Sequence, residues 1–418
     1  MNNRMALLLC FLASFFSANA QSISIDSCYQ WAKNNYPLVK QLALIERSKE
    51  YSLANVQKGY LPQVNVSGYS TYQSDVLTFP FNLPGSSIDP LRKDQHRIYG
   101  EITQPITDLW NVKNQKELAA NNADVESQKI EVELYKINER INQLFFGILL
   151  IEEQIKQTTL ISNDLANAMQ KVQAAVDNGT SLSSNLDLLK VEVLKVNQRI
   201  EELTSGKKAY LKMLEQFTGK SISVNTVLLR PSVLQTSESI NRPELKLFSI
   251  QQKSFDIQSR ILTNKTLPKL NFFFQGGYGA PGLNTIDNNP ASYYYTGLRL
   301  NWNLSSFYTY KKERSLLDLN KRGFDIQKET FLLNTNLNIS QQSEEVEKFK
   351  GLINSDIEII KLRMNIKVNT EAQLLNGTIT TFDFLTQINA EDQARQNLVL
   401  HQIQLLYAQY NLLVTKGK

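Results

Sequence analysis

The sequence predicts a mixed α+β protein, mostly helical, in which one arrangement of strands and long helices occurs twice. Three observations lead to this prediction: a repeated motif, short stretches of alternating polarity, and very long heptad patterns. The motif "LPQVN" at 61–65 returns as "LPKLN" at 267–271, 206 residues later. Alternating polarity is typical of strands with one apolar face, and apolar residues in steps of three and four are typical of paired helices.

The N-terminus predicts a secretory signal peptide over residues 1–20. Arg4 precedes an apolar run at 6–16, and Ala18-Asn19-Ala20 supplies an A-x-A cleavage site. The apolar run is too short to span a bilayer. We therefore expect an exported chain that starts at Gln21.

Charge and cysteine content exclude several classes of protein. The whole chain has 45 Lys and Arg against 40 Asp and Glu, and loss of Arg4 with the signal leaves an excess of four positive charges. So small an excess, spread along helices, argues against nucleic acid as a partner. Cys28 would be the only cysteine after cleavage, which rules out a disulfide framework and favours an apolar position on a helix face. No apolar run reaches ~18 residues, the length that a transmembrane helix needs.

The repeat covers nearly the whole exported chain. Residues 35–40 match 241–246 at the offset of 206. Later landmarks match at an offset of 198, namely 104–106 with 302–304, 178–180 with 376–378, and 218–220 with 416–418. One change of offset indicates a tandem duplication in which a single loop differs in length. We expect a first repeat at 21–217, a linker at 218–241 and a second repeat at 242–418.

Each repeat is predicted to begin with a helix, at 36–58 and 242–265, that opens near a proline. Two strand pairs follow, at about 62–76 with 95–107 and 268–280 with 292–305. In the last strand, Leu298, Leu300, Trp302 and Leu304 share one face, and Arg299, Asn301 and Asn303 share the other. Each strand is therefore expected to be apolar on one face and mixed or polar on the other.

From about residue 112 the pattern becomes helical, and no proline interrupts it. Apolar residues form a heptad seam from Ile130 to Val176, and after Asn178-Gly179 a second seam runs from Leu182 to Leu203. The pattern predicts two antiparallel coiled-coil helices joined by a sharp turn. A helix over 112–177 would be about 100 Å long at ~1.5 Å per residue, far longer than a globular domain needs.

The predicted strands are long enough to cross an outer membrane when they are tilted by ~45°. Four strands cannot close a barrel, and an open sheet edge is not tolerated in hydrocarbon. The chain would therefore have to oligomerise in a membrane. Three copies would give twelve strands and a ring of twelve antiparallel helices.

In its order of elements the chain resembles the TolC-like outer membrane efflux proteins. The resemblance runs from "SISIDSCYQWAKNNYPLVK" through "GYLPQVNVSGYSTY" to "NGTITTFDFLTQ". Its specific signal is the order of proline-led helix, strand pair, long helix, glycine turn and helix, found twice. The resemblance implies a homotrimer with a twelve-stranded outer-membrane β-barrel, four strands from each chain, continued by a long periplasmic α-helical coiled-coil barrel. The linker at 218–241 would then belong to an equatorial region.

The resemblance also implies a function and partners. Members of the family are outer-membrane exit ducts of tripartite efflux or type I secretion systems in Gram-negative bacteria, and they extend into the periplasm. Implied partners are two further copies of the chain, a periplasmic adaptor (membrane fusion) protein, an inner-membrane RND or ABC transporter, and outer-membrane lipid. The resemblance implies no cofactor.

Site residues follow from the same resemblance, which places a periplasmic aperture just after the second glycine turn. The acid that matches the family's ring of aspartates is Asp383, and a second aspartate can occur where this chain has Thr386. Where an arginine can tie the closed state, this chain has Ile379. The counterparts in the first repeat are Asn185 and Asp187. Asp383 also fits the plainer role of a residue that starts a helix.

The two turns between helices are the expected contact surface for the adaptor. Their residues are Asn178, Gly179, Thr180, Asn376, Gly377 and Thr378. A left-handed residue is often needed where one helix reverses into another, so the two glycines are also explained by structure alone.

Other functions fit parts of the pattern. The nearest alternative is the outer-membrane component of a heavy-metal cation efflux system, and a periplasmic coiled-coil adaptor is disfavoured because the chain has two helical hairpins and no inner-membrane anchor. An enzyme is not expected, since "TGKS" at 218–221 lacks the first glycine of a phosphate loop. His96 and His401 lie in different predicted elements, so no metal site is predicted.

Overall fold

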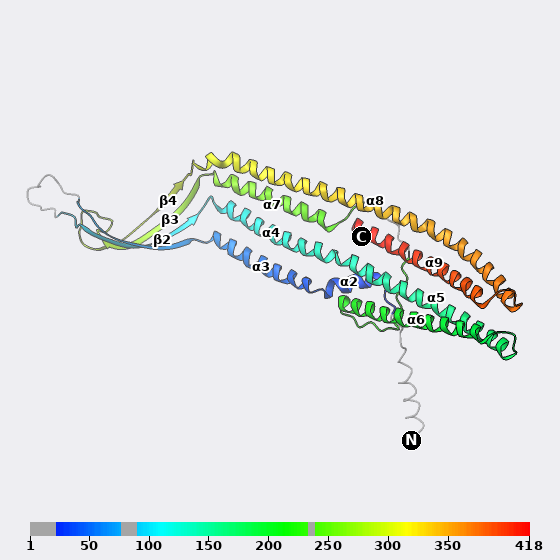
Figure 1. Ribbon diagram of the computed structural model, residues 1–418. Helices are drawn as coiled ribbons and strands as arrows, with labels where there is room; N and C mark the ends of the chain where they lie inside the picture. Colours follow the sequence, from blue (N-terminus) through cyan, green and yellow to red (C-terminus); the bar gives the residue numbers. More distant parts are fainter. Residues whose placement is uncertain (1–21, 77–89, 233–238) are drawn as a thin grey trace, which may run out of the picture. The chain divides into compact units, whose positions relative to one another are not determined.

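Figure 1 shows the computed structural model, which describes residues 22–76, 90–232 and 239–418. The predicted signal peptide at 1–20 lies outside the described residues, as does part of the predicted linker. None of the described helices has a segment long and apolar enough to cross a membrane.

The chain divides into two compact units. Unit 1 combines the residues up to Lys40 with Ile130–Pro243 and Thr330–Lys418, and unit 2 combines Gln41–Lys129 with Glu244–Glu329. The units do not coincide with the predicted repeats, because each unit takes segments from both halves of the chain.

Unit 2 contains a four-stranded antiparallel sheet whose strands follow sequence order. The strands are β1 (Gln63–Tyr72), β2 (Asp94–Pro105), β3 (Lys269–Ala280) and β4 (Ala291–Asn301). All four lie where the sequence predicts strands, so the two strand pairs are confirmed. β2 also pairs with β3, which leaves β1 and β4 as the edge strands of the sheet.

The last strand is shorter than the alternation predicted. β4 ends at Asn301 instead of residue 305, so Trp302 and Leu304 lie beyond the strand and not on its apolar face. The reason is local, since the Ser306 hydroxyl donates a hydrogen bond to the carbonyl of Asn303 (2.6 Å) where the turn leads into the next helix. Side chains that bond to nearby backbone in this way compete with a strand ladder.

The register places most of the large apolar residues of the four strands on one face of the sheet. Directly paired residues of an antiparallel sheet share a face. Val64 pairs with Ile102, and Ile102 pairs in turn with Phe274. The large apolar residues of this face that are exposed are Val64, Val66, Tyr72, Ile98, Ile102, Phe272, Phe274, Tyr278, Tyr294, Leu298 and Leu300, and Leu270 on the same face is half-buried. The predicted alternation is confirmed, and it extends across the whole sheet.

The opposite face of the sheet combines charged, amide and aromatic side chains. Arg299 on β4 donates two hydrogen bonds to the carboxylate of Glu101 on β2 (2.8 and 3.1 Å) and lies over the ring of Phe273 (4.5 Å to its centroid). The Tyr295 hydroxyl donates to Gln275 Oε1 (2.7 Å). The two faces of the sheet therefore differ sharply in chemistry.

The helices of unit 2 adjoin the strands in sequence and are linked by polar side chains. They are α3 (Lys40–Gln57), α7 (Pro243–Lys265) and the first parts of α4 (Leu109–Tyr135) and α8 (Ser306–Leu375). Ion pairs link them in the order α3, α4, α7, α8: Lys49–Asp124 (2.9 Å), Glu117–Arg260 (2.5 Å) and Asp256–Lys321 (2.6 Å). α3 buries no side chain in the single chain. The predicted helices at 36–58 and 242–265 are confirmed, the first with a 3-10 turn at Pro37–Val39.

Unit 1 holds the main hydrophobic core. It is built by α2 (Ile25–Asn35), α5 (Ile137–Asp177), α6 (Ser183–Thr218) and α9 (Thr381–Lys416). Cys28 on α2 is fully buried in this core, as predicted, and burial raises the pKa of its thiol to about 12. The thiol therefore stays protonated and acts as a small apolar group. The sequence predicted a helix-face position for Cys28 but gave no bounds for α2.

The long helix predicted over 112–177 is divided into two helices. α4 ends at Tyr135 and α5 begins at Ile137, with Lys136 between them. Lys136 keeps right-handed angles (φ −61°, ψ −21°), so the interruption is confined to one residue. Periodicity did not detect it, because Leu134 and Ile137 keep their places in the apolar seam and both are buried. In the second half α8 runs without a break over 70 residues.

Candidate functional site

The two helix reversals of unit 1 have the same local structure. Asn178 ends α5, and Gly179 follows with a left-handed φ of +72°. Thr180 then donates two hydrogen bonds to the carbonyl of Ala175, from its amide (2.8 Å) and its hydroxyl (2.9 Å). These bonds satisfy carbonyls that a helix end leaves without partners.

The second reversal repeats this geometry after α8. Gly377 has a φ of +68°, and the amide and hydroxyl of Thr378 both donate to the carbonyl of Gln373 (3.0 Å each). The predicted sharp turns are confirmed, and Figure 1 shows both at the same end of unit 1. Asn178, Thr180 and the residues at 376–378 are all exposed.

The helices that follow the two turns begin differently. Thr380 caps α9 in a capping box: Asp383 N donates to Thr380 Oγ1 (3.1 Å), and Thr380 N donates to Asp383 Oδ2 (3.0 Å). The Thr380 hydroxyl also donates to this carboxylate (2.6 Å). These bonds hold the pKa of Asp383 below its usual range, since they favour the charged form. The helix-start role of Asp383 is thus present in the single chain, and its carboxylate is exposed.

The counterparts in α6 have weaker local roles. Asn185 donates a hydrogen bond to the Ser181 hydroxyl (3.1 Å), and Asp187 pairs with Lys190 one helical turn later (3.3 Å). No side chain caps the start of α6. The two predicted halves of the aperture therefore differ chemically. The carboxylate of Asp383 in α9 is fixed by more hydrogen bonds than that of Asp187 in α6.

Thr386 is exposed one helical turn beyond Asp383, and its hydroxyl donates to the carbonyl of Phe382 (2.9 Å). Ile379 is half-buried and packs against the apolar cluster of the turns. An apolar residue at this position thus has a packing role in the chain.

A second apolar core ties the two helical hairpins together near their turns. Leu165, Leu186 and Leu189 of α5 and α6 pack with Phe384, Leu385 and Ile388 of α9. Beside this core lies a groove of about 700 Å³ that both turns line. Its lining residues include Gly179, Thr180, Asn185, Asn376 and Gly377. The structure thus gathers most of the predicted tip residues around one groove.

A cluster of charged residues, which the sequence did not predict, joins the three helices α5, α8 and α9. Lys367 of α8 pairs with Asp164 of α5 (2.5 Å) and with Glu391 of α9 (2.9 Å), and Arg395 also pairs with Glu391 (2.7 Å). Burial alone would raise the pKa of Glu391, but its bonds to Lys367 and Arg395 hold that pKa below its usual range. The buried carboxylate therefore stays charged at neutral pH.

Two further acids of unit 1 have unexpected surroundings. Burial raises the pKa of Asp392, against the opposing effects of Gln396 and of Arg199 on α6, 4.0 Å away. His401 of α9, for which the sequence predicted no partner, bonds Asp356 of α8 through its Nδ1 (2.6 Å). Of these charged interactions, the sequence could have predicted only the pair of Glu391 and Arg395, because the two residues are four apart on one helix.

Comparison with known proteins yields a match at the level of structure alone. No family model matches the sequence, and no curated protein matches it either. Solved structures do match: CusC, described as forming a transmembrane channel, has a TM-score of 0.69 at 10% identity and covers 94% of this chain and 92% of its own. The outer membrane protein VceC from Vibrio cholerae has a TM-score of 0.64 at 11% identity, with 93% and 95% covered.

The Campylobacter jejuni CmeC outer membrane channel matches with a TM-score of 0.63 at 12% identity, covering 94% of this chain and 85% of its own. The chain has the fold of these outer-membrane channels. The TolC-like fold predicted from the order of elements is therefore confirmed. Because so few residues are identical, the TolC-like fold must depend on strand alternation, heptad spacing and glycine turns rather than on particular side chains.

Proposed function

We propose that the chain forms an exit duct in the outer membrane of a Gram-negative bacterium and extends into the periplasm. The observation that carries this proposal is the exposed apolar face of the sheet, continuous over four strands in a chain with the fold of outer-membrane channels. In water, an apolar patch of this extent promotes aggregation. In a bilayer it would face lipid, and the face with Arg299 and Glu101 would face a water-filled passage.

Aromatic residues at both ends of the apolar face support this orientation. Tyr72, Tyr278 and Tyr294 lie near the ends of the strands away from the helices, and Trp110 and Trp302 lie near the helix ends, all exposed. From Tyr294 to Asn301, just before Trp302, β4 advances seven residues, or about 24 Å, which is about 18 Å along the normal of a membrane for a strand tilted by ~40°. Aromatic girdles flank an apolar band of ~25 Å in such proteins.

We infer a homotrimer, because the edges of one chain need partners. The outer edges of β1 and β4 would leave backbone groups unpaired in hydrocarbon. Leu44 and Tyr51, seven residues apart on α3, and Leu319 and Ile326, seven apart on α8, are each more than 60% exposed. Residues seven apart lie on one face of a helix, as at a coiled-coil interface. Three chains joined through β4 and β1 would give twelve strands, with α8 of one chain against α3 of the next.

The tips would then form the periplasmic end of the duct. We propose that the groove lined by both turns receives the adaptor protein of an efflux or type I secretion system, which links the duct to an inner-membrane RND or ABC transporter. Asp383 and Thr386, with Asn185 and Asp187, are proposed to surround the aperture there. The exposed carboxylate of Asp383 and the apolar core behind it support this assignment. A conduit of this kind carries out no chemistry, so we infer that the chain is not an enzyme.

Planar-bilayer recording tests the duct with two matched variants. We expect the purified protein to insert and conduct ions. Val66 and Asn65 are neighbours in β1 on opposite faces of the sheet. Val66→Arg would place a charge in lipid at a cost of ~2–4 kcal/mol and should prevent insertion, whereas Asn65→Arg should insert and conduct. Equal insertion of both variants would reverse the assignment of the faces, and absence of conductance in the parent would contradict the duct.

A further inference from the structure

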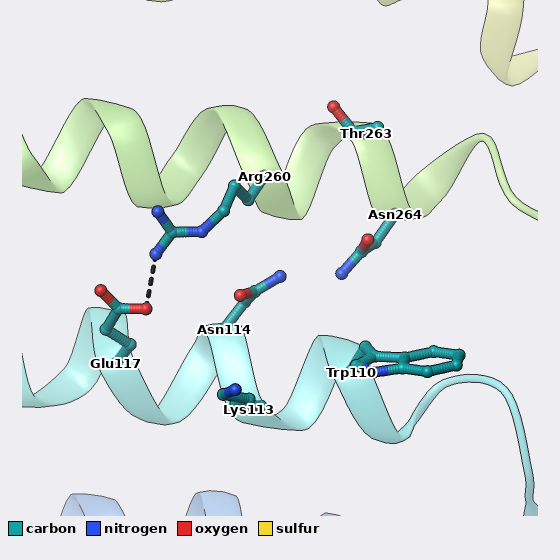
Figure 2. A pocket seen from close by; sticks show the side chains of 7 residues that line it. All are labelled: Trp110, Lys113, Asn114, Glu117, Arg260, Thr263 and Asn264. Atoms are coloured by element: carbon teal, nitrogen blue, oxygen red, sulfur yellow. Dashed lines mark hydrogen bonds and ion pairs between the residues drawn. The ribbon is translucent and has the colours of Figure 1, made fainter.

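A hollow of about 550 Å³ lies between α4 and α7, close to where both helices meet the strands of unit 2. Figure 2 shows its seven lining residues: Trp110, Lys113, Asn114 and Glu117 of α4, and Arg260, Thr263 and Asn264 of α7. The ion pair between Glu117 and Arg260 (2.5 Å) closes the end farther from the strands. Trp110 forms the other end, where its side chain is 68% exposed.

The polar groups of the hollow include donors that the described residues leave unused. Lys113 makes no ion pair with any described residue. Asn264 Nδ2 is buried and has no hydrogen-bond partner among the described residues. A buried donor without a partner is unfavourable, and a bound acceptor would satisfy it. An ammonium and an amide N–H that line the same hollow are donors that suit a phosphate oxygen.

The surroundings of the hollow are aromatic and strongly basic. At the helix ends that adjoin the strands, residues 56–62, 106–117, 260–269 and 302–314, there are nine Lys and Arg against three Asp and Glu. Tyr60, Trp302 and Tyr308 are exposed in the same segments. Amphipathic aromatic rings and Lys or Arg side chains gather at the level of lipid headgroups in membrane proteins.

We propose that this hollow binds the headgroup of a phospholipid from the periplasmic leaflet of the outer membrane. The proposal rests on the proposed function, which puts these helix ends just below the hydrocarbon. Lys113 and the amide of Asn264 bind the phosphate, and the exposed ring of Trp110 packs against the glycerol and the first methylene groups. The acyl chains continue along the apolar face of the sheet, whose exposed residues toward the helix ends include Phe272, Leu298 and Leu300.

A lipid suits the hollow better than a free anion does. One ammonium and one amide donor give weak affinity for inorganic phosphate because the ion keeps most of its hydration. A phospholipid gains further affinity from each methylene group that leaves water, and it is already concentrated in the membrane beside the site. The occupant is therefore identified by its phosphate and its apolar chains together.

The test counts lipids retained by the full-length protein. Protein reconstituted in nanodiscs of phosphatidylethanolamine and phosphatidylglycerol is transferred to mild detergent and analysed by native mass spectrometry. A titration with short-chain phosphatidylglycerol then gives the affinity. We expect one retained phospholipid per chain, with affinity about tenfold lower in Lys113→Gln and in Asn264→Leu. The matched control is Lys116→Gln, which removes the same charge from the same helix but outside the hollow and should bind as the parent does.

Each result decides the proposal. Equal losses in Lys113→Gln and Lys116→Gln would indicate diffuse attraction to a basic surface and would overturn the site. Displacement of the lipid by inorganic phosphate would make it an anion site and overturn the lipid assignment. A parent protein that is trimeric and conducts ions but retains no lipid would overturn the hollow alone. A parent that neither assembles nor conducts would overturn the proposed function, and the lipid site with it.

Discussion

At the scale of single residues, Asp383 shows how one side chain can satisfy two interpretations. Its carboxylate closes a capping box with Thr380, which accounts for an acid at this position in any helix start. The same carboxylate is exposed beside the groove of the turns, where three copies would meet in a trimer. The capping bonds fix the carboxylate in position, so the two roles are compatible.

Substitution of Asp383 separates these roles. We expect Asp383→Asn to lower cation-over-anion selectivity severalfold in planar-bilayer recordings, because a ring of three negative charges at a narrow aperture attracts cations. Trimer assembly should be unchanged. Asp318→Asn, an exposed acid on α8 in unit 2, is the control and should conduct like the parent. If selectivity changed in the control and not in Asp383→Asn, the aperture would have been assigned to the wrong end of the helices.

At the scale of elements, the charged cluster around Glu391 connects α5, α8 and α9 through ion pairs. Glu391 is 4% exposed and makes ion pairs to both Lys367 and Arg395. Removing its charge leaves Lys367 and Arg395 without their shared partner, although Lys367 keeps its ion pair with Asp164. A buried group that loses its partner costs more than an exposed pair contributes.

Glu391→Gln should therefore lower the free energy of unfolding by about 1–3 kcal/mol. The pKa of Glu391 is lower in the folded state than in the unfolded state. Its charge therefore contributes fully to the free energy of unfolding at pH values above the ordinary pKa of a glutamate, and this contribution is lost as the pH falls through the folded-state pKa. Thermal melts from neutral to acid pH should show the parent and Glu391→Gln converging as the pH falls. Glu153→Gln, which breaks an exposed pair with Lys156, should cost less than ~0.5 kcal/mol at any pH. A parallel pH dependence of the parent and Glu391→Gln would contradict the role of the cluster.

Elements were predictable where the pattern is local. Strand alternation located β1 to β4, and the heptad seams identified Leu165, Leu186 and Leu189 as buried residues. The predicted end of β4 was wrong because a hydrogen bond to the carbonyl of Asn303 starts a turn there, and the alternation of apolar residues gives no sign of such a bond. The partners of Glu391 and His401 were not predictable, since Lys367, Asp164 and Asp356 reach them only after three helices pack. Asp383 was identified through the family resemblance, and its position at the start of a helix was predicted from the local sequence.

At the scale of the whole molecule, the features of the single chain are incomplete without partners. The sheet has two open edges, its apolar face is exposed, and α3 buries no side chain. A TolC-like trimer would pair the edges, place the apolar face in lipid and cover the exposed heptad residues of α3 and α8. A closed ring of chains meets all three requirements, and the proposed function makes that ring a trimer, which is why the oligomeric state is the central claim.

The most direct test is the mass of the complex extracted from membranes in mild detergent, measured by native mass spectrometry or light scattering. The account predicts a single species with three times the mass of the mature chain. This species should be stable on dilution, because dissociation would leave the edges of β1 and β4 unpaired. A monomer that keeps its helices and sheet under the same conditions would contradict it, since four strands with two open edges would then be stable by themselves.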